Sequence, residues 1–422
     1  MKPRYTALPS LIVLGILIVT CAGAATDPHY ALATAGSELY IFRDQGKWDT
    51  KSWSRLLSVT DHPSALAGVA TDGRYVYVAD NVAGTLTVGT IGNLLGTPTW
   101  TEVAPPIVLK NSDDTLRVDN PTQIAVDRSG GVYVVGGPLG TSLDSNFAYV
   151  KPTAGDWKTP IVSIGQILNS TLADVAVSNS GANALIAFRR DDPSTATSYT
   201  CKATEDAVSA IRSLLPKSFN ARAVAVDPSL GTDGYAYVVN NNSDSPPTKG
   251  SVRVVDAATG EPRGSSAIEL VLNTTPEEVM RPDDVATFTI GENHYLGITG
   301  LNAGAGEAWK VLLDKNSDWV PILTEGSVDS APIPTAGHHC AASSDGEVFW
   351  YTSANGTMGA LDAGTWMKLA PTVFDGTIGG MIKLENVTTY APVPIPEPSS
   401  LLSLAGLLGA GLGLLRRRNA NA

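Results

Sequence analysis

The sequence is poor in cysteine, histidine and charge. It has 422 residues with three cysteines and five histidines, and charged residues make up 17% of it, below the roughly 25% of an average soluble domain. So few cysteines exclude a disulfide-stapled scaffold, and the sequence contains no C-x-x-C, H-E-x-x-H, G-x-S-x-G or P-loop motif. The formal net charge of −12 argues against nucleic acid as a partner, because phosphate binding needs a basic face. The chain has instead 41 glycines and 27 prolines, which favour many short strands and turns over long helices.

Residues 1–25 have the features of a cleaved secretory signal peptide. Lys2 and Arg4 precede the apolar run LPSLIVLGILIVT, and Ala22 and Ala24 fit the small-x-small pattern of a cleavage site. The alternatives are an uncleaved anchor helix and a lipoprotein signal that uses Cys21. Each of these interpretations predicts export.

The other end of the chain has three parts in a fixed order. They are a Pro-rich spacer over residues 392–398, an uncharged apolar stretch over residues 399–415 and a basic tail over residues 416–422. A helix over the apolar stretch is just long enough to cross a bilayer, and a basic tail is expected to stay in the cytoplasm. Residues 26–391 are therefore expected to lie outside the inner membrane.

This three-part end resembles the PEP-CTERM sorting signal of exosortase-bearing Gram-negative bacteria. The residues that carry the resemblance are Pro396, Glu397, Pro398, Arg416, Arg417 and Arg418. The resemblance implies that an exosortase-type membrane protease recognises the Pro-Glu-Pro and removes the tail after export. It also implies delivery to the cell surface or the extracellular polysaccharide matrix. Proteins with this signal have diverse bodies, so it implies no particular activity.

Between the two ends, one pattern recurs: an apolar strand, a tight polar turn and a second strand rich in aromatic and β-branched residues. The units begin at Leu32, Val69, Ile124, Val175, Val224, Val285 and Cys340. Their spacing is close to the roughly 40 to 50 residues of a four-stranded propeller blade. The pattern predicts an all-β, seven-bladed β-propeller over residues 26–391, with a pair of β-sandwiches as the alternative.

Two further segments carry predictions about this fold. Ring closure is expected to pair GMIKLENVTTYA, from Gly380, with the residues after Tyr30. The segment EDAVSAIRSLLP, from Glu205, is predicted to be helical.

The repeats resemble those of NHL-type and gluconolactonase-like propellers, and the segment from Pro121 to Val135 matches best. In gluconolactonase-like families the channel mouth holds a divalent ion bound by Glu, Asn and Asp. No Glu stands at an equivalent strand start here, so the resemblance implies the fold more strongly than the ion site.

An Asp stands at the turn inside four of the repeats: Asp72, Asp127, Asp227 and Asp345. These carboxylates could form a ring of metal ligands. The simpler interpretation is that they stabilise the hairpins of one face by accepting hydrogen bonds from nearby backbone amides.

The opposite face is the better candidate for a site, because the start of the first strand and the end of the second meet there. The candidate mouth or metal residues are Asp80, Asn81, Asn240, Asp283, Asn302, His338, His339 and Asn355, in a wider polar rim that includes Asp174 and Asp284. Carboxylate and amide oxygens suit Ca²⁺. Adjacent His338 and His339 would point to opposite faces of a regular strand, and the plainest alternative is a solvated polar rim.

Two functions follow. The first is an exported, transiently anchored surface or matrix protein whose propeller binds extracellular polysaccharide or another surface protein. The alternative is an extracytoplasmic hydrolase or lactonase that depends on a divalent metal. No residue is assigned a catalytic role, because the usual catalytic motifs are absent.

Overall fold

The computed structural model describes residues 28–44, 52–59, 66–136, 145–167, 170–190, 198–203, 208–213, 221–241, 249–264, 267–272, 278–302, 304–335, 337–369 and 386–390. The regular elements in these ranges are β-strands, and no helix there is long and apolar enough to cross a membrane. The predicted signal peptide, the Pro-Glu-Pro spacer, the apolar stretch and the basic tail all lie outside the described residues.

Within the described ranges the strands fall into seven sheets. The first sheet contains β30 (Asn386–Tyr390), β1 (Tyr30–Ala35), β2 (Glu38–Arg43) and β3 (Trp53–Ser58). The second contains β4 (Leu66–Thr71), β5 (Val76–Asp80), β6 (Thr85–Gly92), β7 (Thr99–Glu102) and β8 (Ile107–Val108). The third contains β9 (Pro121–Val126), β10 (Val132–Gly136), β11 (Ser145–Thr153) and β12 (Asp156–Ile167).

The remaining sheets continue in chain order. The fourth contains β13 (Ser170–Val177), β14 (Asn183–Arg190), β15 (Ser198–Ala203) and β16 (Val208–Ser213). The fifth contains β17 (Ala221–Asp227), β18 (Tyr235–Asn240), β19 (Ser251–Asp256) and β20 (Ile268–Glu269). The sixth contains β21 (Val271–Leu272), β22 (Glu278–Ile290), β23 (Asn293–Asn302), β24 (Ala305–Asp314), β25 (Val320–Pro321) and β26 (Val328–Pro332). The last contains β27 (Gly337–Ala342), β28 (Val348–Ser353) and β29 (Met358–Asp362).

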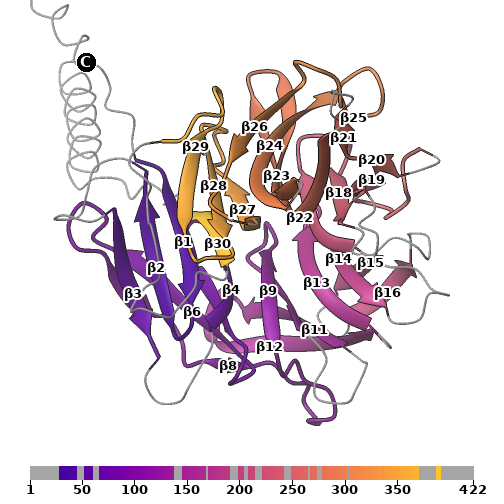
Figure 1. Ribbon diagram of the computed structural model, residues 1–422. Coiled ribbons are helices and arrows are strands. Elements are labelled where there is room, and N and C mark those ends of the chain that lie inside the picture. The colour runs from indigo at the N-terminus through magenta and orange to yellow at the C-terminus, as the bar shows by residue number, and fades with distance from the viewer. Residues whose placement is uncertain are drawn as a thin grey trace, which may run out of the picture.

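One strand of each sheet lies toward a common centre. In cyclic order the inner strands β4, β9, β13, β17, β22, β27 and β30 each contact the next, and β30 contacts β4. Figure 1 shows β30, β4, β9, β13, β22 and β27 around the middle of the molecule, with β3, β12 and β16 at the periphery. The architecture is therefore an all-β propeller, and the alternative of paired sandwiches is wrong.

The two ends of the described chain meet in one sheet. β30 pairs antiparallel with β1, from Tyr30 opposite Tyr390 to Thr34 opposite Asn386. This pairing confirms the closure predicted from the sequence. The predicted helix after Glu205 is wrong, because Val208–Ser213 forms β16 at the edge of the fourth sheet. Pairing with β15 decides the conformation there, since tertiary context overrides a weak helical preference.

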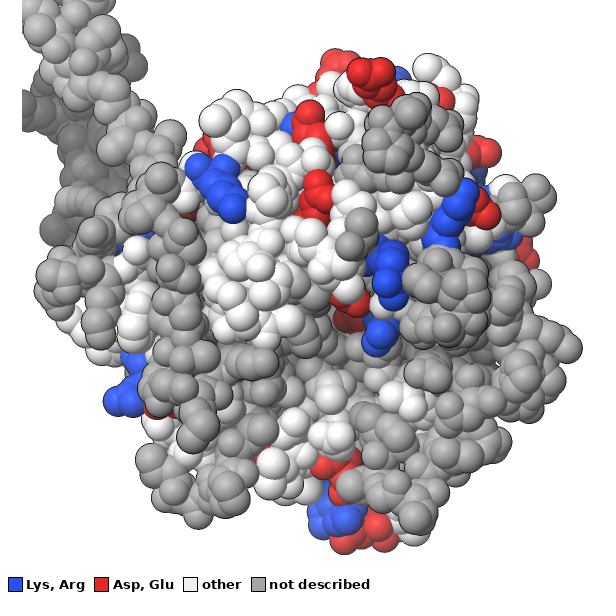
Figure 2. Space-filling view, in the orientation of Figure 1, with Lys and Arg blue, Asp and Glu red and all other residues white. Residues whose placement is uncertain are grey.

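Lys, Arg, Asp and Glu side chains are dispersed over the face of the molecule that Figure 2 shows. In the space-filling view, Lys and Arg atoms are interspersed with Asp and Glu atoms, without a large patch of one sign on the face in view (Figure 2).

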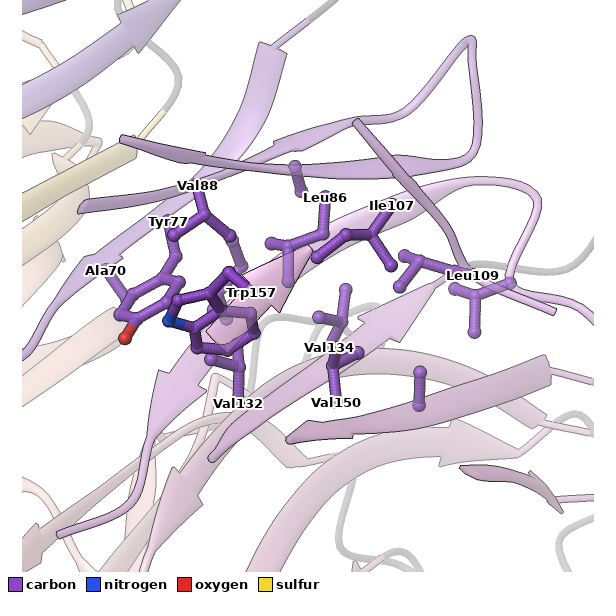
Figure 3. Close-up of a cluster of buried hydrophobic side chains, with 14 of the residues drawn as sticks. Ala70, Tyr77, Leu86, Val88, Ile107, Leu109, Val132, Val134, Val150 and Trp157 are labelled. Carbon is purple, nitrogen blue, oxygen red and sulfur yellow. The ribbon is translucent and has the colours of Figure 1, made fainter. Parts of the chain in front are cut away.

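The core lies between adjacent sheets rather than at the centre of the ring. Along β5, Tyr77 packs against Val132 of the third sheet, whereas Val76 and Val78 pack against Leu32 of the first. Figure 3 shows the cluster on the Tyr77 side. Both faces of such a strand are covered, so its sequence is a continuous apolar run. Each large side chain buried in this way stabilises the fold by about 1.5 to 3 kcal/mol.

Candidate functional site at the channel mouth

The inner strands are irregular where they approach the mouth. The pairing register shifts between Leu172 and Asp174 in β13, between Ala221 and Ala223 in β17, and between Pro282 and Asp284 in β22. A further shift lies between Gly337 and Cys340 in β27. A shift of this kind leaves a backbone N–H without its ladder partner. These strands therefore need hydrogen-bond acceptors from outside their own sheet.

Two aspartates supply those acceptors. The Asp174 carboxylate accepts hydrogen bonds from Val175 N at 2.8 Å and from Val224 N, in the next inner strand, at 2.9 Å. The Asp284 carboxylate does the same with Val285 N at 2.8 Å and with Cys340 N of the following inner strand at 2.8 Å. Each carboxylate therefore links two neighbouring sheets at a bulge.

His339 and Asp283 complete the cluster. The Nδ1 atom of His339 lies 3.5 Å from Asp284 Oδ2, and Asn241 Nδ2 donates a hydrogen bond to Asp283 Oδ1 at 3.1 Å. Asp284 is buried, whereas His339 and Asp283 are half-buried. The cluster thus combines three carboxyl groups and one imidazole on three different inner strands.

Burial and mutual charge shift the acid–base properties of this cluster. Burial, reinforced by the charge of Asp284, raises the pKa of Asp174 from 3.8 to about 7. Burial also raises the pKa of Asp283. Burial alone would lower the pKa of His339, but its interactions with Asp284, and the charges of Asp174 and Asp283, outweigh this and raise it. One carboxyl group of the cluster therefore titrates near neutral pH.

Cys340 is adjacent to the cluster, and its surroundings favour the protonated thiol over the nucleophilic thiolate. Its thiol is buried, and the Sγ atom is 3.8 Å from the carbonyl oxygen of Gly297, to which it donates. Burial raises the pKa of this thiol well above its ordinary value. The protonated thiol is unreactive, because the thiolate is the nucleophilic form.

The described carboxylates of the mouth cluster are already engaged, which argues against the divalent ion that the gluconolactonase-like resemblance implies. A hard cation such as Ca²⁺ needs six to eight oxygen ligands that converge on one point. Both oxygens of Asp174 and of Asp284 already accept a backbone N–H. Among the described residues, the only three His, Cys, Asp or Glu side chains whose ligand atoms all lie within 4.8 Å of one another are His29, Asp345 and Glu347, outside this cluster.

Most of the other predicted mouth residues serve their own loops. Asp80 is buried, and its Oδ1 atom accepts hydrogen bonds from Val82 N and Ala83 N at 3.0 and 2.9 Å. Asn302 Nδ2 donates to Glu307 Oε2 at 2.8 Å within the β23–β24 hairpin. Asn355 accepts a hydrogen bond from Thr357 N at 3.0 Å in the β28–β29 turn.

The last three predicted residues differ in what the structure shows. Asn240 is buried at the end of β18. Asn81 is half-buried, and its Oδ1 atom has no hydrogen-bond partner among the residues that the structure describes. The side chain of His338 lies outside the described residues. Of the predicted set, the structure therefore brings only Asp283 and His339 into the central cluster.

The sequence does contain a signal for Asp174 and Asp284, the two cluster aspartates that were not among the main candidate residues. The inner strands LADVAV and PDDVAT share the order Asp-Val-Ala, and aligning them places Asp174 and Asp284 at the same position of the repeat. In GHHCAA of β27 the same position is His339. Both aspartates belonged to the wider predicted rim, but only this alignment singles them out. The nearby Arg222 and Arg281, whose charges act on Asp283, carried no such signal.

The turn aspartates of the opposite face behave as predicted. Asp72 Oδ1 accepts from Arg74 N at 2.9 Å, and Asp127 Oδ1 accepts from Gly131 N at 2.9 Å. Asp227 and Asp345 make equivalent bonds with the backbone N–H groups of Ser229 and Glu347, at 3.0 and 3.1 Å. The hairpin interpretation is confirmed.

The second oxygen of each turn aspartate reaches another side chain. In the second and third sheets it accepts a hydrogen bond from a phenol: Tyr77 to Asp72 at 3.0 Å and Tyr149 to Asp127 at 2.9 Å. Asp227 and Asp345 instead face an imidazole of the adjacent sheet, with His294 Nδ1 at 2.7 Å and His29 Nε2 at 2.8 Å. Two of the four turns thus also join neighbouring sheets.

Comparisons with solved structures identify similar folds. The periplasmic gluconolactonase PpgL of Pseudomonas aeruginosa is 13% identical, with a TM-score of 0.59 over 87% of this chain and 100% of that one. A candidate 6-phosphogluconolactonase from Bacteroides fragilis is 10% identical, with a TM-score of 0.56 over 87% of this chain and 99% of that one. Sqt1 of Saccharomyces cerevisiae is 11% identical, with a TM-score of 0.50 over 80% and 81% of the two chains.

These likenesses support the gluconolactonase-like propeller fold expected from the repeats, and at such identities they show the fold alone. No protein-family model matches the sequence, and no curated protein matches it either.

Proposed function

We propose that this chain is an exported, seven-bladed β-propeller that serves as a binding module, with its ligand surface at the channel mouth. The blade count is supported by the seven sheets of the described residues and the closed cycle of inner-strand contacts. Export, and transient anchoring until an exosortase-type protease removes the tail, rest on the sequences of the two ends.

The hydrogen bonds of Asp174 and Asp284 support a binding module, because they assign these two carboxylates a structural role. Both carboxylates are occupied in joining adjacent inner strands, so their first role is to hold the ring together. Other polar groups of the mouth are available to a ligand. Arg222 is exposed, and its charge acts on the half-buried Asp283, which accepts a hydrogen bond from the buried Asn241. Carboxylate, amide and guanidinium groups together can donate to and accept from sugar hydroxyls. An extracellular polysaccharide is the ligand that this rim suits best.

The test is binding of the full chain to purified extracellular polysaccharide, measured by calorimetry. Arg222→Ser and Asp283→Asn are expected to weaken binding about tenfold each, the equivalent of about 1.4 kcal/mol. Arg74→Ser is the matched control, because Arg74 is exposed in a hairpin turn of the opposite face. Equal affinity of all four proteins would contradict a ligand surface at the mouth.

Export is tested separately, in the producing bacterium. Mass spectrometry of the mature protein is expected to find an N-terminus just after the Ala22–Ala24 signature and the loss of residues 399–422. A cell-associated protein that keeps both ends would contradict this part of the proposal.

A hydrolase remains the second candidate because Asp174, a carboxyl group with a pKa of about 7, lies in the same cluster as His339. A general acid or base works best when its pKa is near the working pH. In this alternative, Asp174 or His339 moves the proton during opening of a lactone or ester. Hydrolysis of a lactone panel that Asp174→Asn and His339→Gln both abolish would favour this function over binding alone.

A further inference from the structure

A second cluster lies on the turn face, where the beginning of the described chain meets the β27–β28 hairpin. His29 stands immediately before β1, and its Nε2 atom lies 2.8 Å from Asp345 Oδ2 and 3.6 Å from Glu347 Oε2. The ligand atoms of these three residues all lie within 4.8 Å of one another. Two carboxylates thus converge on one nitrogen of a single imidazole.

The imidazole is held in a fixed orientation from behind. Its Nδ1 atom is 2.9 Å from Asp44 Oδ2, and the backbone N–H of His29 donates to Asp44 Oδ1 at 2.8 Å. The Asp44 side chain is 2% exposed. Metal-bound histidines typically donate their second ring N–H to such a carboxylate, which fixes the tautomer and directs the other nitrogen at the ion. By holding Nδ1 and the backbone N–H of His29, Asp44 orients the ring so that its Nε2 atom faces Asp345 and Glu347.

The front of the cluster is open and adjustable. The side chains of Asp345 and Glu347 are 49% and 60% exposed, so each can shift by a fraction of an ångström and water can complete a coordination shell. Tetrahedral Zn²⁺ with bonds near 2.0 to 2.1 Å holds its ligand atoms about 3.3 Å apart. The separations of 2.8 and 3.6 Å lie on either side of that value.

The chain contains a natural comparison for this cluster. His294 faces Asp227 at 2.7 Å, and Asp227 occupies the same place in its hairpin as Asp345. Two residues further on, Ser229 stands where the His29 cluster has Glu347, and its Oγ atom is 3.4 Å from His294 Nδ1. The His294 group therefore has the imidazole and the first carboxylate, with a serine hydroxyl in place of the second carboxylate.

We propose that His29, Asp345 and Glu347 form a divalent transition-metal site, with Zn²⁺ as the best-suited ion and Asp44 as the residue that positions His29. One imidazole nitrogen and two carboxylate oxygens are ligands that Zn²⁺ accepts, with water in the fourth position. On binding, the ion takes the place of any proton on Nε2, which is released to solvent. The site fastens the residue before β1 to a hairpin 316 residues away, next to the β1–β30 closure.

The experiment is calorimetric titration of the full chain with Zn²⁺ after removal of any affinity tag, because tag histidines would themselves bind the metal. One Zn²⁺ per chain is expected, and Ca²⁺ is expected to give no heat at this site. Glu347→Gln is expected to weaken Zn²⁺ binding at least about tenfold, and Asp44→Asn about 10- to 100-fold, as for other residues behind a metal ligand. Because Glu347 is exposed, its variant tests the site even if His29→Ala does not fold.

Two variants serve as controls. His294→Ala and His339→Ala are expected to keep the stoichiometry and affinity of the wild-type chain, because neither residue lies in the cluster. Ser229→Glu adds the missing carboxylate beside Asp227 and is expected to raise the stoichiometry toward two. The absence of Zn²⁺ binding at micromolar concentrations, or an unchanged affinity in Glu347→Gln, would overturn the proposal. Loss of the site in His339→Ala would also overturn it, by placing the ion at the mouth.

Discussion

The channel mouth and the turn face use the same residue type for the same task, but in different surroundings. On the inner strands, Asp174 and Asp284 join neighbouring sheets by accepting backbone N–H groups of the next inner strand. On the turn face, Asp227 and Asp345 join neighbouring sheets by facing an imidazole. The partner thus changes from a neutral amide to a group that can carry positive charge.

One aspartate of each face has a shifted pKa, and the two shifts run in opposite directions. Asp174 has its pKa raised to about 7 by burial and by the charge of Asp284. Burial would also raise the pKa of Asp345, but hydrogen bonds from Ser343, Glu347 N and His29 outweigh it and hold that pKa below its ordinary value. The comparison shows that the residue type alone does not fix the ionisation state; the partners and the access of water do.

The largest effect is expected from removing a channel carboxylate. Asp284→Ala leaves the N–H groups of Val285 and Cys340 without this acceptor in a buried position. Each unsatisfied group costs about 1 to 3 kcal/mol, so the loss of both partners should lower the free energy of unfolding by about 2 to 6 kcal/mol. Urea denaturation of the two proteins measures it. Asp284→Asn keeps one acceptor oxygen and should lose less stability. An Asp284→Ala variant as stable as the wild type would show that the hydrogen bonds of Asp284 to the two strands do not stabilise the fold.

A smaller loss of stability is expected where His29, just before β1, meets the β27–β28 hairpin. His29→Ala removes the partner of the buried Asp44 and of the more exposed Asp345. These interactions are intermediate in burial between a surface ion pair and a fully buried one, so the free energy of unfolding is expected to fall by about 1 to 3 kcal/mol. Denaturation is measured with a chelator present, so that the result does not depend on bound metal. An equal loss in His294→Ala, which has no such second carboxylate, would remove the distinction between the two histidines.

The pH dependence of stability separates the channel from the turn face. Because the folded state raises the pKa of Asp174 from 3.8 to about 7, it binds this proton more tightly than the unfolded state does. The contribution of Asp174 is therefore most favourable below about pH 4 and is lost as the pH rises through about 7, with a slope of at most about 1.4 kcal/mol per pH unit.

Comparing the wild type with Asp174→Asn at pH 5 and pH 8 isolates this contribution. Asp284 on β22 and His339 on β27 are the charged groups that act on Asp174, and both remain in the variant. The variant should gain stability relative to the wild type as the pH rises. A difference between the two proteins that is the same at both pH values would mean that Asp174 is already ionised at pH 5.

The smallest effect is expected at an exposed turn. Asp72→Ala removes the acceptor of Arg74 N, Tyr75 N and the Tyr77 hydroxyl, in an exposed hairpin turn where water can replace it. The loss of a cap of this kind should cost about 0.5 to 1 kcal/mol, measured as a decrease in Tm. A loss as large as that of Asp284→Ala would mean that the turn and channel aspartates are energetically equivalent.

Much of the fold could be predicted because it depends on local pattern. The apolar run of β5, with Tyr77 packing on one side and Val78 on the other, predicts a strand covered on both faces. The Asp-to-amide bonds inside the turns, such as Asp127 to Gly131, involve residues close in sequence. The candidate site was only partly predictable, because the mouth residues Asp80 and Asn355 bond within their own loops rather than toward the axis.

The sequence by itself determined the all-β class, the repeated hairpins and the pairing of the segment after Gly380 with the residues after Tyr30. Tertiary structure alone decided which side chains meet, since Asp174 and Val224 are 50 residues apart and Asp284 and Cys340 are 56 apart.

The physical reason is the bulge: one extra residue changes the face to which every later side chain points. Strict alternation therefore does not hold across the register shift of β27, within which His339 lies. Likewise, only closure of the ring brings His29 to Asp345, because no local pattern links residues 316 positions apart.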